Sequence, residues 1–594
     1  MSSSCIMDIE ELEKRGQEMV HRKINKPTLE DAIKYRDLVA DLLAGRNISA
    51  TKRKHKLVEK NSYIYHAYTL LIKQGHIEHN VANDGRLCKA LQIKPCKSWS
   101  GITSITVFTT AYPEYTRESD GVRVKQPFSC AFSCNFCPNQ PGQPRSYILN
   151  EPGILRATRN DHQCVPQMHD RLNALYSIGH TSLGKLEVLV LGGTFASYPV
   201  EYRREFARDI FYAANTFWDP DTTPLREPLS LEQEKEINTV AKSRVIGITF
   251  ETRGDTINTS ELRLYRELGC TRIQMGIQHI DDAILKKNNR QCPHQKTVTA
   301  IKLLKENGFK IDGHFMPNLP GATPAADHDM MIDNLLGVRS HVRGSHFVDE
   351  EYVLANPDIQ VDQVKIYPTA VLPYTEIEKW FLDGSYVPYS DQLVKELVIK
   401  VKSLMFPFIR INRIIRDFFP EAIYAGGGKE MVGLRPEAQS EMSSAGRVIC
   451  KCIRCRENKA AAWDGSYVVH VIKYNASGGD EYFISAESED CKTLYGFARL
   501  RLDSAFNKVF MELNQAALLR ELHVYSQSTF VGDKGLAVQH RGIGSRLMAE
   551  AEAIARRHHY YKMAVISGVG ARTFYKRIGY VLNEGGGEFM MKKI

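Results

Sequence analysis

Three cysteines, Cys130, Cys134 and Cys137, lie in the segment FSCAFSCNFCPNQPG with the spacing CxxxCxxC. Three thiolates can hold three irons of a four-iron, four-sulfur cluster, which leaves the fourth iron open to a non-protein ligand. A zinc knuckle or three buried thiols without metal are the alternatives for so short a pattern. The choice between a redox cluster and a structural role for these cysteines therefore depends on the residues around the triplet.

Two features near the triplet favour the cluster. Phe136 lies inside the loop, and Gly192, Gly193 and Thr194 directly follow the next predicted strand. This layout resembles the radical S-adenosylmethionine superfamily. The resemblance implies a 4Fe-4S cluster that chelates S-adenosylmethionine and cleaves it reductively to a 5′-deoxyadenosyl radical. It also implies that the glycine motif presents its backbone to the amino group of this cofactor.

A second triplet, Cys450, Cys452 and Cys455, has the spacing CxCxxC. Three such thiolates suit a structural zinc site whose fourth ligand comes from elsewhere, for example Cys491 or a nearby histidine. Unrelated thiols in a basic linker are the alternative. If metal is bound, we expect it to hold the flanking domains together rather than to do chemistry.

A glycine-rich segment near the C-terminus, QHRGIG from Gln539 to Gly544, begins a predicted helix. It resembles the pyrophosphate loop QxxGxG of GNAT acetyltransferases. Glycines let the backbone approach phosphates, and free N–H groups at a helix N-terminus bind anions. A glycine turn without any ligand is the alternative for this segment alone.

Two further segments resemble the same GNAT fold. The preceding strand, which contains Glu521, Leu522, His523 and Val524, corresponds to the strand that pairs with the pantetheine arm. In the following RTFYKRIGY, Tyr575 would lie near the thioester sulfur, where a phenol can protonate a departing thiolate. The alternative for Tyr575 is a half-buried aromatic on an amphipathic helix.

The order of apolar runs predicts the elements that position these residues. Six apolar strands alternate with amphipathic helices between about residues 100 and 400, which is typical of a parallel sheet and here of a partial (β/α)6 barrel. Its active site is expected at the carboxyl ends of the strands. The chain is thus predicted to be α/β, with four parts: a basic helical N-terminal domain (1–98), the barrel (99–404), a basic linker (405–465) and the GNAT domain (466–594).

Composition indicates in which kind of protein and cell compartment this chemistry takes place. The chain has 594 residues, a net charge of +9 and 13 cysteines without an evenly spaced framework. Six of the cysteines fall in the two triplets, which favours metal over disulfides. No apolar run is long enough to span a membrane and no secretory signal is present. We therefore expect a soluble protein of the cytoplasm, with a nuclear pool as an alternative. The basic run from Lys52 to Lys56 indicates either a polyanionic partner or a solvated helix face.

The combination of these parts resembles the catalytic subunit of Elongator, the tRNA uridine(34) acetyltransferase family. From about residue 100 onward the likeness includes LEVLVLGGTF, GITFETRGD, CTRIQMGIQ, HFMPNLPG, VKIYPT, RELHVY, QHRGIG and AVISGVGARTFYKRIGY. It implies a tRNA-modifying enzyme that forms 5-carboxymethyluridine at the wobble position. In the family mechanism, the radical abstracts hydrogen from the acetyl methyl of acetyl-CoA, the carbon radical adds to uridine C5, and thioester hydrolysis releases CoA.

The resemblance also assigns roles to residues. Cys130, Cys134 and Cys137 would hold the cluster, and Lys185 matches a lysine associated with acetyl-CoA. The remaining acetyl-CoA contacts would come from Glu521 to Val524, from Val538, Gln539 and His540, from Gly542 and Gly544, and from Tyr575. The anticodon stem-loop of tRNA would bind the N-terminal domain and the segment FIRINRIIRDFF, and Elongator-type subunits are expected partners.

The chain also departs from its eukaryotic relatives. Its first two cluster cysteines are closer together, ETRPD appears as ETRGD, and paired tyrosines appear as Phe574 and Tyr575. It is therefore identified as a divergent member. Two other functions stay open at this point: a protein lysine acetyltransferase with a structural cluster, and a non-enzymatic scaffold that binds tRNA.

Overall fold

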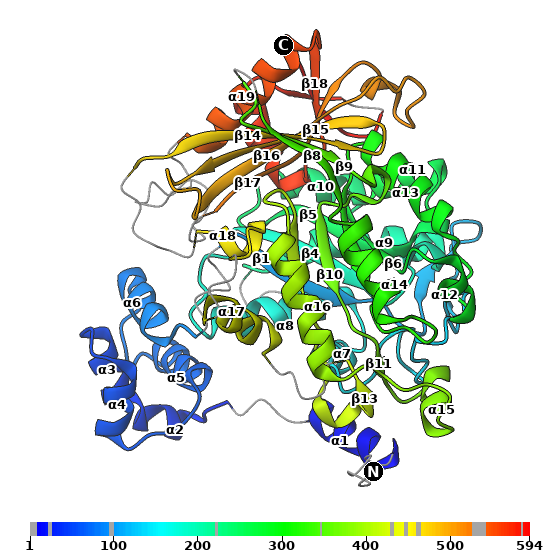
Figure 1. The fold of residues 1–594 in the computed structure, drawn as a ribbon. Coiled ribbons are helices and arrows are strands. Elements are labelled where there is room, and N and C mark those ends of the chain that lie inside the picture. Colours follow the sequence, from blue (N-terminus) through cyan, green and yellow to red (C-terminus); the bar gives the residue numbers. More distant parts are fainter. Residues whose placement is uncertain are drawn as a thin grey trace.

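The computed structural model describes residues 9–21, 26–93, 100–219, 224–344, 347–427, 433–444, 449–458, 465–525, 542–583 and 586–594. Two large sheets and a separate group of helices make up this part of the chain (Figure 1). None of its helices is long and apolar enough to cross a bilayer.

A half-barrel forms the centre of the molecule. Within the described residues, seven parallel strands pair in the order β1-β4-β5-β6-β7-β10-β12. The six strands predicted from sequence are all present. The seventh, β12, lies in the segment predicted as a basic linker. It escaped prediction because it has only four residues, two of them arginines. The strands are β1 (Thr103–Phe108), β4 (Lys185–Leu191), β5 (Arg244–Arg253), β6 (Cys270–Gln278), β7 (Lys310–Phe315), β10 (Gln363–Ile366) and β12 (Arg410–Arg413).

Helices cover the outer face of this sheet (Figure 1). Every second side chain of β4 is buried against them, namely Leu186, Val188 and Val190, as the two-residue period of a strand requires. The opposite side chains face the interior of the half-barrel. The helices are α7 (Pro152–Arg159), α8 (Cys164–Tyr176), α9 (Val200–Thr216), α10 (Leu231–Asn238), α11 (Thr259–Glu267), α12 (Asp282–Lys287), α13 (His294–Glu306), α14 (Pro324–His328), α15 (Glu376–Leu382) and α16 (Asp391–Leu404).

The second sheet is mixed and contains the C-terminal strands. As far as the chain is described, its order is β19-β20-β18-β17-β16-β15-β14-β9-β8. The predicted strand with Glu521 to Val524 and the predicted helix after the glycine-rich segment are present as β17 and α19. The elements are β14 (Val468–Ala476), β15 (Gly479–Glu487), β16 (Leu494–Leu502), β17 (Ala517–Val524), β18 (Lys562–Val565), β19 (Val581–Leu582), β20 (Met590–Lys593), α19 (Ile543–Arg557) and α20 (Arg572–Arg577).

A hairpin from the barrel region completes this second sheet. Strands β8 (Val338–Arg343) and β9 (Glu350–Leu354) lie between β7 and β10 in sequence, yet β9 pairs in parallel with β14. Sequence reasoning did not predict the hairpin. The six residues of β8 are all exposed. The strand therefore has no buried face, and it lacks the alternation of apolar and polar residues that predicts a half-buried strand.

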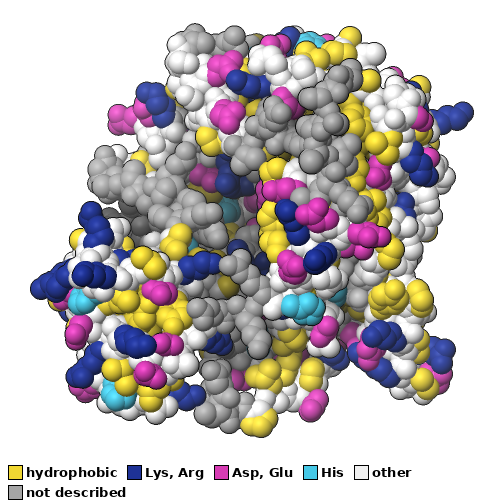
Figure 2. Space-filling view, turned by 90° about the horizontal axis from the view of Figure 1, so that it is seen from below, with side chains coloured by type: hydrophobic (Ala, Val, Ile, Leu, Met, Phe, Trp, Pro, Cys, Tyr) yellow, Lys and Arg dark blue, Asp and Glu magenta, His cyan; other side chains and the backbone are white. Residues whose placement is uncertain are grey.

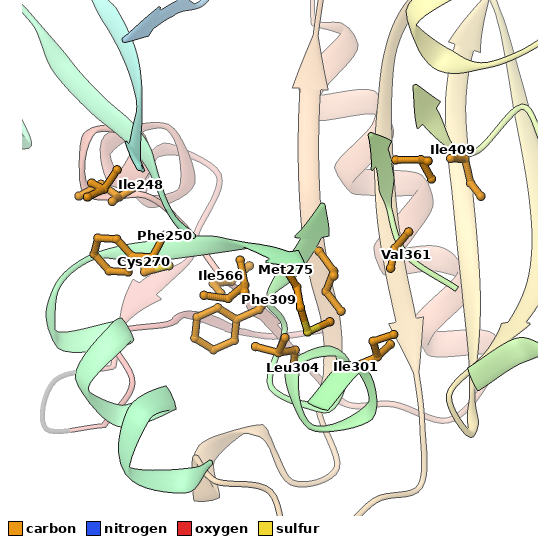
Figure 3. Close-up of a cluster of buried hydrophobic side chains, with 14 of the residues drawn as sticks. Ile248, Phe250, Cys270, Met275, Ile301, Leu304, Phe309, Val361, Ile409 and Ile566 are labelled. Atoms are coloured by element: carbon orange, nitrogen blue, oxygen red, sulfur yellow. The ribbon is translucent and has the colours of Figure 1, made fainter. Parts of the chain in front are cut away.

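The two sheets share one hydrophobic core. Ile566, which follows β18, lies beside Phe309, which precedes β7 (Figure 3). A buried ionic network adds to this contact. Arg520 of β17 binds Asp362, just before β10, at 2.6 Å and Glu481 of β15 at 2.8 Å. All three side chains are inaccessible to solvent. The barrel and the C-terminal sheet are therefore fixed to each other through the interior of the protein.

The N-terminal helices fall into two places. Helices α2 (Leu29–Lys34), α3 (Arg36–Leu43), α4 (Ile48–His55), α5 (Asn61–Lys73) and α6 (Val81–Leu91) surround a core of their own. Helix α1 (Ile9–His21) lies instead against the barrel beside α7 (Figure 1). Its Glu13 carboxylate accepts hydrogen bonds from Tyr374 and Gln140. The predicted N-terminal segment is thus divided in space.

Candidate active site

The first cysteine triplet lies in the loop that follows β1 and the small hairpin of β2 (Glu114–Thr116) and β3 (Arg123–Lys125). Cys134 is buried, whereas Cys130 and Cys137 are partly exposed. The Cys134 sulfur accepts hydrogen bonds from the guanidinium groups of Arg253 at 3.3 Å and Arg290 at 3.8 Å. Two cations therefore lie beside the sulfur of one predicted cluster ligand.

The spacing of the three sulfurs separates a cluster from a single ion. Zinc binds sulfur at about 2.3 Å, so two sulfurs on one ion lie within roughly 4.6 Å of each other. Among the described residues, Cys450, Cys452 and Cys455 are the only potential ligands that approach one another within 4.8 Å as a group of three. Cys130, Cys134 and Cys137 are not such a group. Their sulfur atoms are therefore too far apart to bind one zinc ion together.

The glycine motif forms a tight turn at the carboxyl end of β4. Gly192 and Gly193 have φ angles of 133° and 89°, a region that favours glycine. A Cβ on Gly192 would lie only 1.9 Å from the Thr109 hydroxyl. Cys130 donates a hydrogen bond to the Thr194 hydroxyl at 3.2 Å, so this turn contacts the cluster loop directly. The predicted residues Cys130 and Gly192 to Thr194 are thus brought together.

Glu251 of β5 is a site residue that sequence reasoning missed. Its carboxylate accepts hydrogen bonds from the Tyr147 hydroxyl at 2.6 Å and from the N–H groups of Gly192 and Gly193 at 3.4 Å. A carboxylate at this turn is suited to bind the amino group of an amino acid. One signal could have found it: Glu251 is an acidic residue at the end of the predicted strand RVIGITFE, whose centre is mostly apolar.

A cavity of about 650 Å³ extends inward from this turn. Cys137, Gly193, Thr194 and Glu251 line its upper end, at the carboxyl ends of the strands. His314 of β7 also lines it, and its Nε2 atom has no hydrogen-bond partner. Burial holds the pKa of His314 well below its usual value, and Lys365 and Arg416 add to this effect. The imidazole is therefore neutral, and the cavity fits a polar ligand that supplies the missing partner.

The GNAT-type residues meet at the opposite end of the barrel. Val524 ends β17, and Gly542 caps α19 in the left-handed conformation with φ of 84°. A Cβ on Gly544 would lie 3.7 Å from Val524 and 3.5 Å from Phe574, so the three segments adjoin. Val538, Gln539 and His540 lie outside the described residues. From Gly542 onward, the first turn of α19 presents backbone N–H groups at a helix N-terminus, as phosphate binding requires.

Glu521 and Tyr575 have distinct environments in this region. The Glu521 carboxylate binds Arg499 at 3.0 Å and Arg272 of the barrel at 3.6 Å, so its side chain belongs to the domain contact. Leu522, His523 and Val524 are partly exposed at the rim. Tyr575 packs edge-on against Phe574, and burial raises the pKa of its phenol. Tyr575 therefore remains protonated at neutral pH and can donate a proton.

Lys185 lies at the start of β4, whereas the glycine motif follows its end. Lys185 is seven residues from Gly192, and at the rise of a parallel strand this corresponds to about 23 Å. The neighbouring strand places Arg244 beside Lys185, and Arg244 donates a hydrogen bond to Thr573 of α20 at 3.0 Å. Lys185 is thus brought to the GNAT-type residues and not to the glycine motif. Burial, with help from Arg244, lowers the pKa of Lys185 to about 8.

The second cysteine triplet lies between the two sheets. The segment that carries it forms α18 (Ile453–Arg456), where the Ile453 N–H bonds Ile409 of the barrel and the Asn458 N–H bonds Leu494 of β16. Hydrogen bonds from Cys450 and Cys455 hold the pKa of Cys452 well below its usual range. No fourth His, Cys, Asp or Glu of the described residues completes the group, and the predicted candidate Cys491 is not part of it. The three sulfurs fit a tetrahedral zinc ion with one further ligand.

Comparison with known proteins agrees with this arrangement. Models of the radical SAM superfamily, the radical SAM C-terminal domain and the acetyltransferase (GNAT) family match residues 128–331, 361–443 and 457–580. The tRNA uridine(34) acetyltransferase of Dehalococcoides mccartyi is 33% identical over 83% of this chain and 98% of its own length. The chain belongs to the tRNA uridine(34) acetyltransferase family. Elongator complex protein 3 of Bos taurus is 31% identical over 86% of this chain and 87% of that protein.

A solved relative shares the fold of the family. The archaeal Elp3 of Methanocaldococcus infernus, lacking residues 1–46, superposes with a TM-score of 0.64 at 27% identity. The match covers 83% of this chain and 100% of that structure. The predicted combination of a radical SAM half-barrel and a GNAT domain is thus confirmed. This chain is an enzyme of that family.

Proposed function

We propose that this protein modifies the wobble uridine of tRNA to 5-carboxymethyluridine with acetyl-CoA as carbon donor. One observation supports the proposal above all: the cluster loop and the GNAT-type residues lie at opposite ends of the same half-barrel. A protein acetyltransferase with a structural cluster would not need a cavity between the two. The family relatives named as tRNA uridine(34) acetyltransferases carry the same two domains.

The residues at the cluster end of the half-barrel would bind the cluster and orient S-adenosylmethionine. Cys130, Cys134 and Cys137 would hold a 4Fe-4S cluster, which, with S-adenosylmethionine bound, supplies a strong hydrogen-abstracting radical. Glu251 would bind the amino group of that cofactor, since its carboxylate already accepts three donors at the glycine turn. Arg253, fixed by Asp255 at 2.7 Å, would balance the charge of the cluster.

The residues of the GNAT end would hold acetyl-CoA. Leu522 to Val524 offer a partly exposed strand edge to the pantetheine arm, and Gly542 and Gly544 offer N–H groups to the pyrophosphate. Val538 to His540 are proposed to complete this loop. Tyr575 would donate a proton to the departing thiolate, and the Lys185 ammonium would attract the thioester oxygen.

The anticodon stem-loop of tRNA is the proposed substrate. Figure 2 shows Lys and Arg side chains gathered on the left of the face, over the N-terminal helices. In α4 and its cap, Arg53 and Lys56 are exposed, whereas Lys54 pairs with Asp41 at 2.7 Å. In the second predicted RNA-binding segment, Arg413 pairs with Asp417 at 2.7 Å and Arg416 binds Glu151. We therefore propose Arg53 and Lys56 as phosphate contacts.

The remaining assignments are proposals about the setting of this reaction. We propose four functional parts, which are residues 1–98, 99–404, 405–465 and 466–594. Helix α1 and the β8–β9 hairpin each pack against a part other than their own. Elongator-type subunits are proposed partners, since Elongator complex protein 3 is a relative. A cytoplasmic location, with a nuclear pool, suits a tRNA-modifying enzyme.

A single assay tests the proposed function. Anaerobically reconstituted protein is incubated with tRNA, acetyl-CoA, reductant and S-adenosylmethionine, and nucleosides are analysed by mass spectrometry. We expect 5-carboxymethyluridine and 5′-deoxyadenosine. Acetylated protein without 5′-deoxyadenosine would favour a lysine acetyltransferase, and binding of tRNA without either product would favour a scaffold.

Removal of zinc should loosen the contact between the two domains. We propose that Cys450, Cys452 and Cys455 bind one zinc ion, and that Cys452→Ala lowers its content to near zero. A structural zinc contributes directly to folding, so we expect a lower midpoint of thermal unfolding for this variant. Metal analysis by mass spectrometry checks the content. Cys491→Ala serves as a control and should keep the zinc; if it loses zinc, Cys491 is the fourth ligand.

Acetyl-CoA should bind more weakly as pH rises through about 8. Lys185 is charged below its pKa of about 8 and neutral above it, whereas an ordinary lysine keeps its proton to near 10.5. A neutral amine no longer attracts the thioester oxygen. Calorimetric titration between pH 6.5 and 9.5, without S-adenosylmethionine, should show this loss for the wild type. Lys185→Gln should bind weakly with no step near pH 8; a step that persists in the variant assigns it to another group.

A further inference from the structure

The inward face of β4 is accessible to solvent along its whole length. Lys185, Glu187, Leu189 and Leu191 are all partly exposed, whereas the residues between them are buried against the helices. On the neighbouring β1, Ser104 and Thr106 are also accessible, and Ser104 is level with Glu187 in the strand register. The interior of the half-barrel is therefore open from the glycine turn down to the level of Ser104.

This interior is lined by polar side chains, unlike the branched apolar layers that usually fill a barrel. Lys365 of β10 lies 3.4 Å from Asp312 of β7, and Asn412 of β12 donates a hydrogen bond to the same carboxylate at 2.8 Å. The other Asp312 oxygen has no partner, like Nε2 of His314. Buried polar atoms without a partner are expected to meet water or a ligand. The lining thus suits a passage rather than a packed core.

An ionic contact closes the lower end of this passage. The cavity reaches Ser104. At that level, the Arg272 guanidinium binds Glu187 at 2.6 Å and reaches Glu521 of the C-terminal sheet at 3.6 Å. Glu521 begins the strand edge proposed to hold acetyl-CoA, and His523 lies 3.1 Å from the Ser100 carbonyl, just before β1. Arg272 therefore stands between the two ends.

We propose that the acyl end of acetyl-CoA enters the half-barrel from below and that Arg272 is the gate of this passage. The inference rests on the proposed function, in which the acetyl group must reach the cluster end. The two ends lie about 23 Å apart along β4, and an interior route keeps the reacting group away from water. Arg272 contacts both carboxylates at once through different nitrogens, and loss of either contact would free one side of the guanidinium.

Photocrosslinking tests the route without the cluster or S-adenosylmethionine. The probe is CoA with a diazirine-bearing acyl chain in thioether linkage, added to the full chain, and labelled peptides are identified by mass spectrometry. We expect label on residues 103–108 and 185–191. Ser104→Trp should fill the lower end and reduce this label by roughly tenfold, whereas Ser104→Ala should keep it. Calorimetry with the probe should show equal affinity for both variants.

The gate has its own variant. Glu187→Gln keeps the shape of the side chain but weakens its hold on Arg272, so label inside the barrel should rise several-fold. Unchanged label in this variant would overturn Arg272 as the gate. Label confined to the GNAT domain in wild-type protein would overturn the route itself.

Activity gives a second, separable result. With tRNA and both cofactors, Ser104→Trp should lose 5-carboxymethyluridine while still forming 5′-deoxyadenosine, and Ser104→Ala should behave as wild type. Full modification by Ser104→Trp, with its fold confirmed by an unchanged unfolding midpoint, would exclude the interior route. If wild-type protein forms no modified uridine, the proposed function fails, and the labelling pattern still decides the route.

Discussion

Replacing Cys134 by alanine is expected to abolish formation of 5-carboxymethyluridine while leaving acetyl-CoA binding unchanged. Cys134 is the buried member of the triplet, and its sulfur receives the Arg253 and Arg290 guanidinium groups. Without this ligand the cluster cannot be held, and the chemistry that the cluster supplies is lost. Nucleoside mass spectrometry after anaerobic reconstitution measures the product, and iron analysis measures the cluster.

A matched control separates loss of a ligand from loss of a buried sulfur. Cys164 lies buried at the start of α8, in the barrel core. Cys164→Ala should lower stability without removing iron or product. Modified uridine that persists in Cys134→Ala would refute the proposed chemistry, because the cluster would then be dispensable.

Truncating Arg520 to alanine should destabilise the protein strongly. Its guanidinium binds Asp362 and Glu481 and donates a hydrogen bond to the Phe309 carbonyl at 2.7 Å, with no solvent access. Removing it takes the closest cation from two buried carboxylates, although Lys305 stays 3.2 Å from Glu481 and 3.9 Å from Asp362. Breaking a buried pair costs about 3–5 kcal/mol, and we expect the remaining cations to hold the loss near the lower figure. We expect a large fall in the midpoint of thermal unfolding, measured at fixed scan rate.

An exposed pair provides the comparison. Arg117 binds Asp120 at 2.6 Å on the surface. Because solvent screens this pair, Arg117→Ala should leave the unfolding midpoint unchanged. Equal midpoints for Arg520→Ala and wild type would show that the buried network does not hold the barrel to the GNAT domain.

Much of the fold was predictable because its central strands are continuous apolar runs. RVIGITFE and LEVLVLGG lie between the outer helices and the barrel interior. Each can therefore be predicted as a strand from its own residues, without knowledge of the strands that pair with it. The β8–β9 hairpin and β12 were not predictable in this way. Their strands are short, and they are stabilised by pairing with β14 and β10, which lie far away in the chain.

The residues of the candidate site likewise fall into those that could be predicted from local sequence and those that could not. Cys130, Cys134, Cys137 and the glycine turn were predictable because their spacing is local and chemically specific. Glu251 stands out in the sequence only as an acidic residue in a strand, and neither it nor Arg253 acquires a role until neighbouring strands place it beside the cluster loop. Lys185 was predicted as a residue for acetyl-CoA, but its distance from the glycine motif follows from strand geometry.

The sequence by itself determined the two chemistries of this protein, because metal-ligand spacing and a glycine turn before a helix are properties of a few adjacent residues. Only the tertiary structure decided how the two are related. Parallel strands place their carboxyl ends at one edge and their amino ends at the other, so the cluster and the GNAT-type residues lie at opposite ends of one sheet. The interior between them is lined by side chains from seven strands, and no local pattern could have shown it.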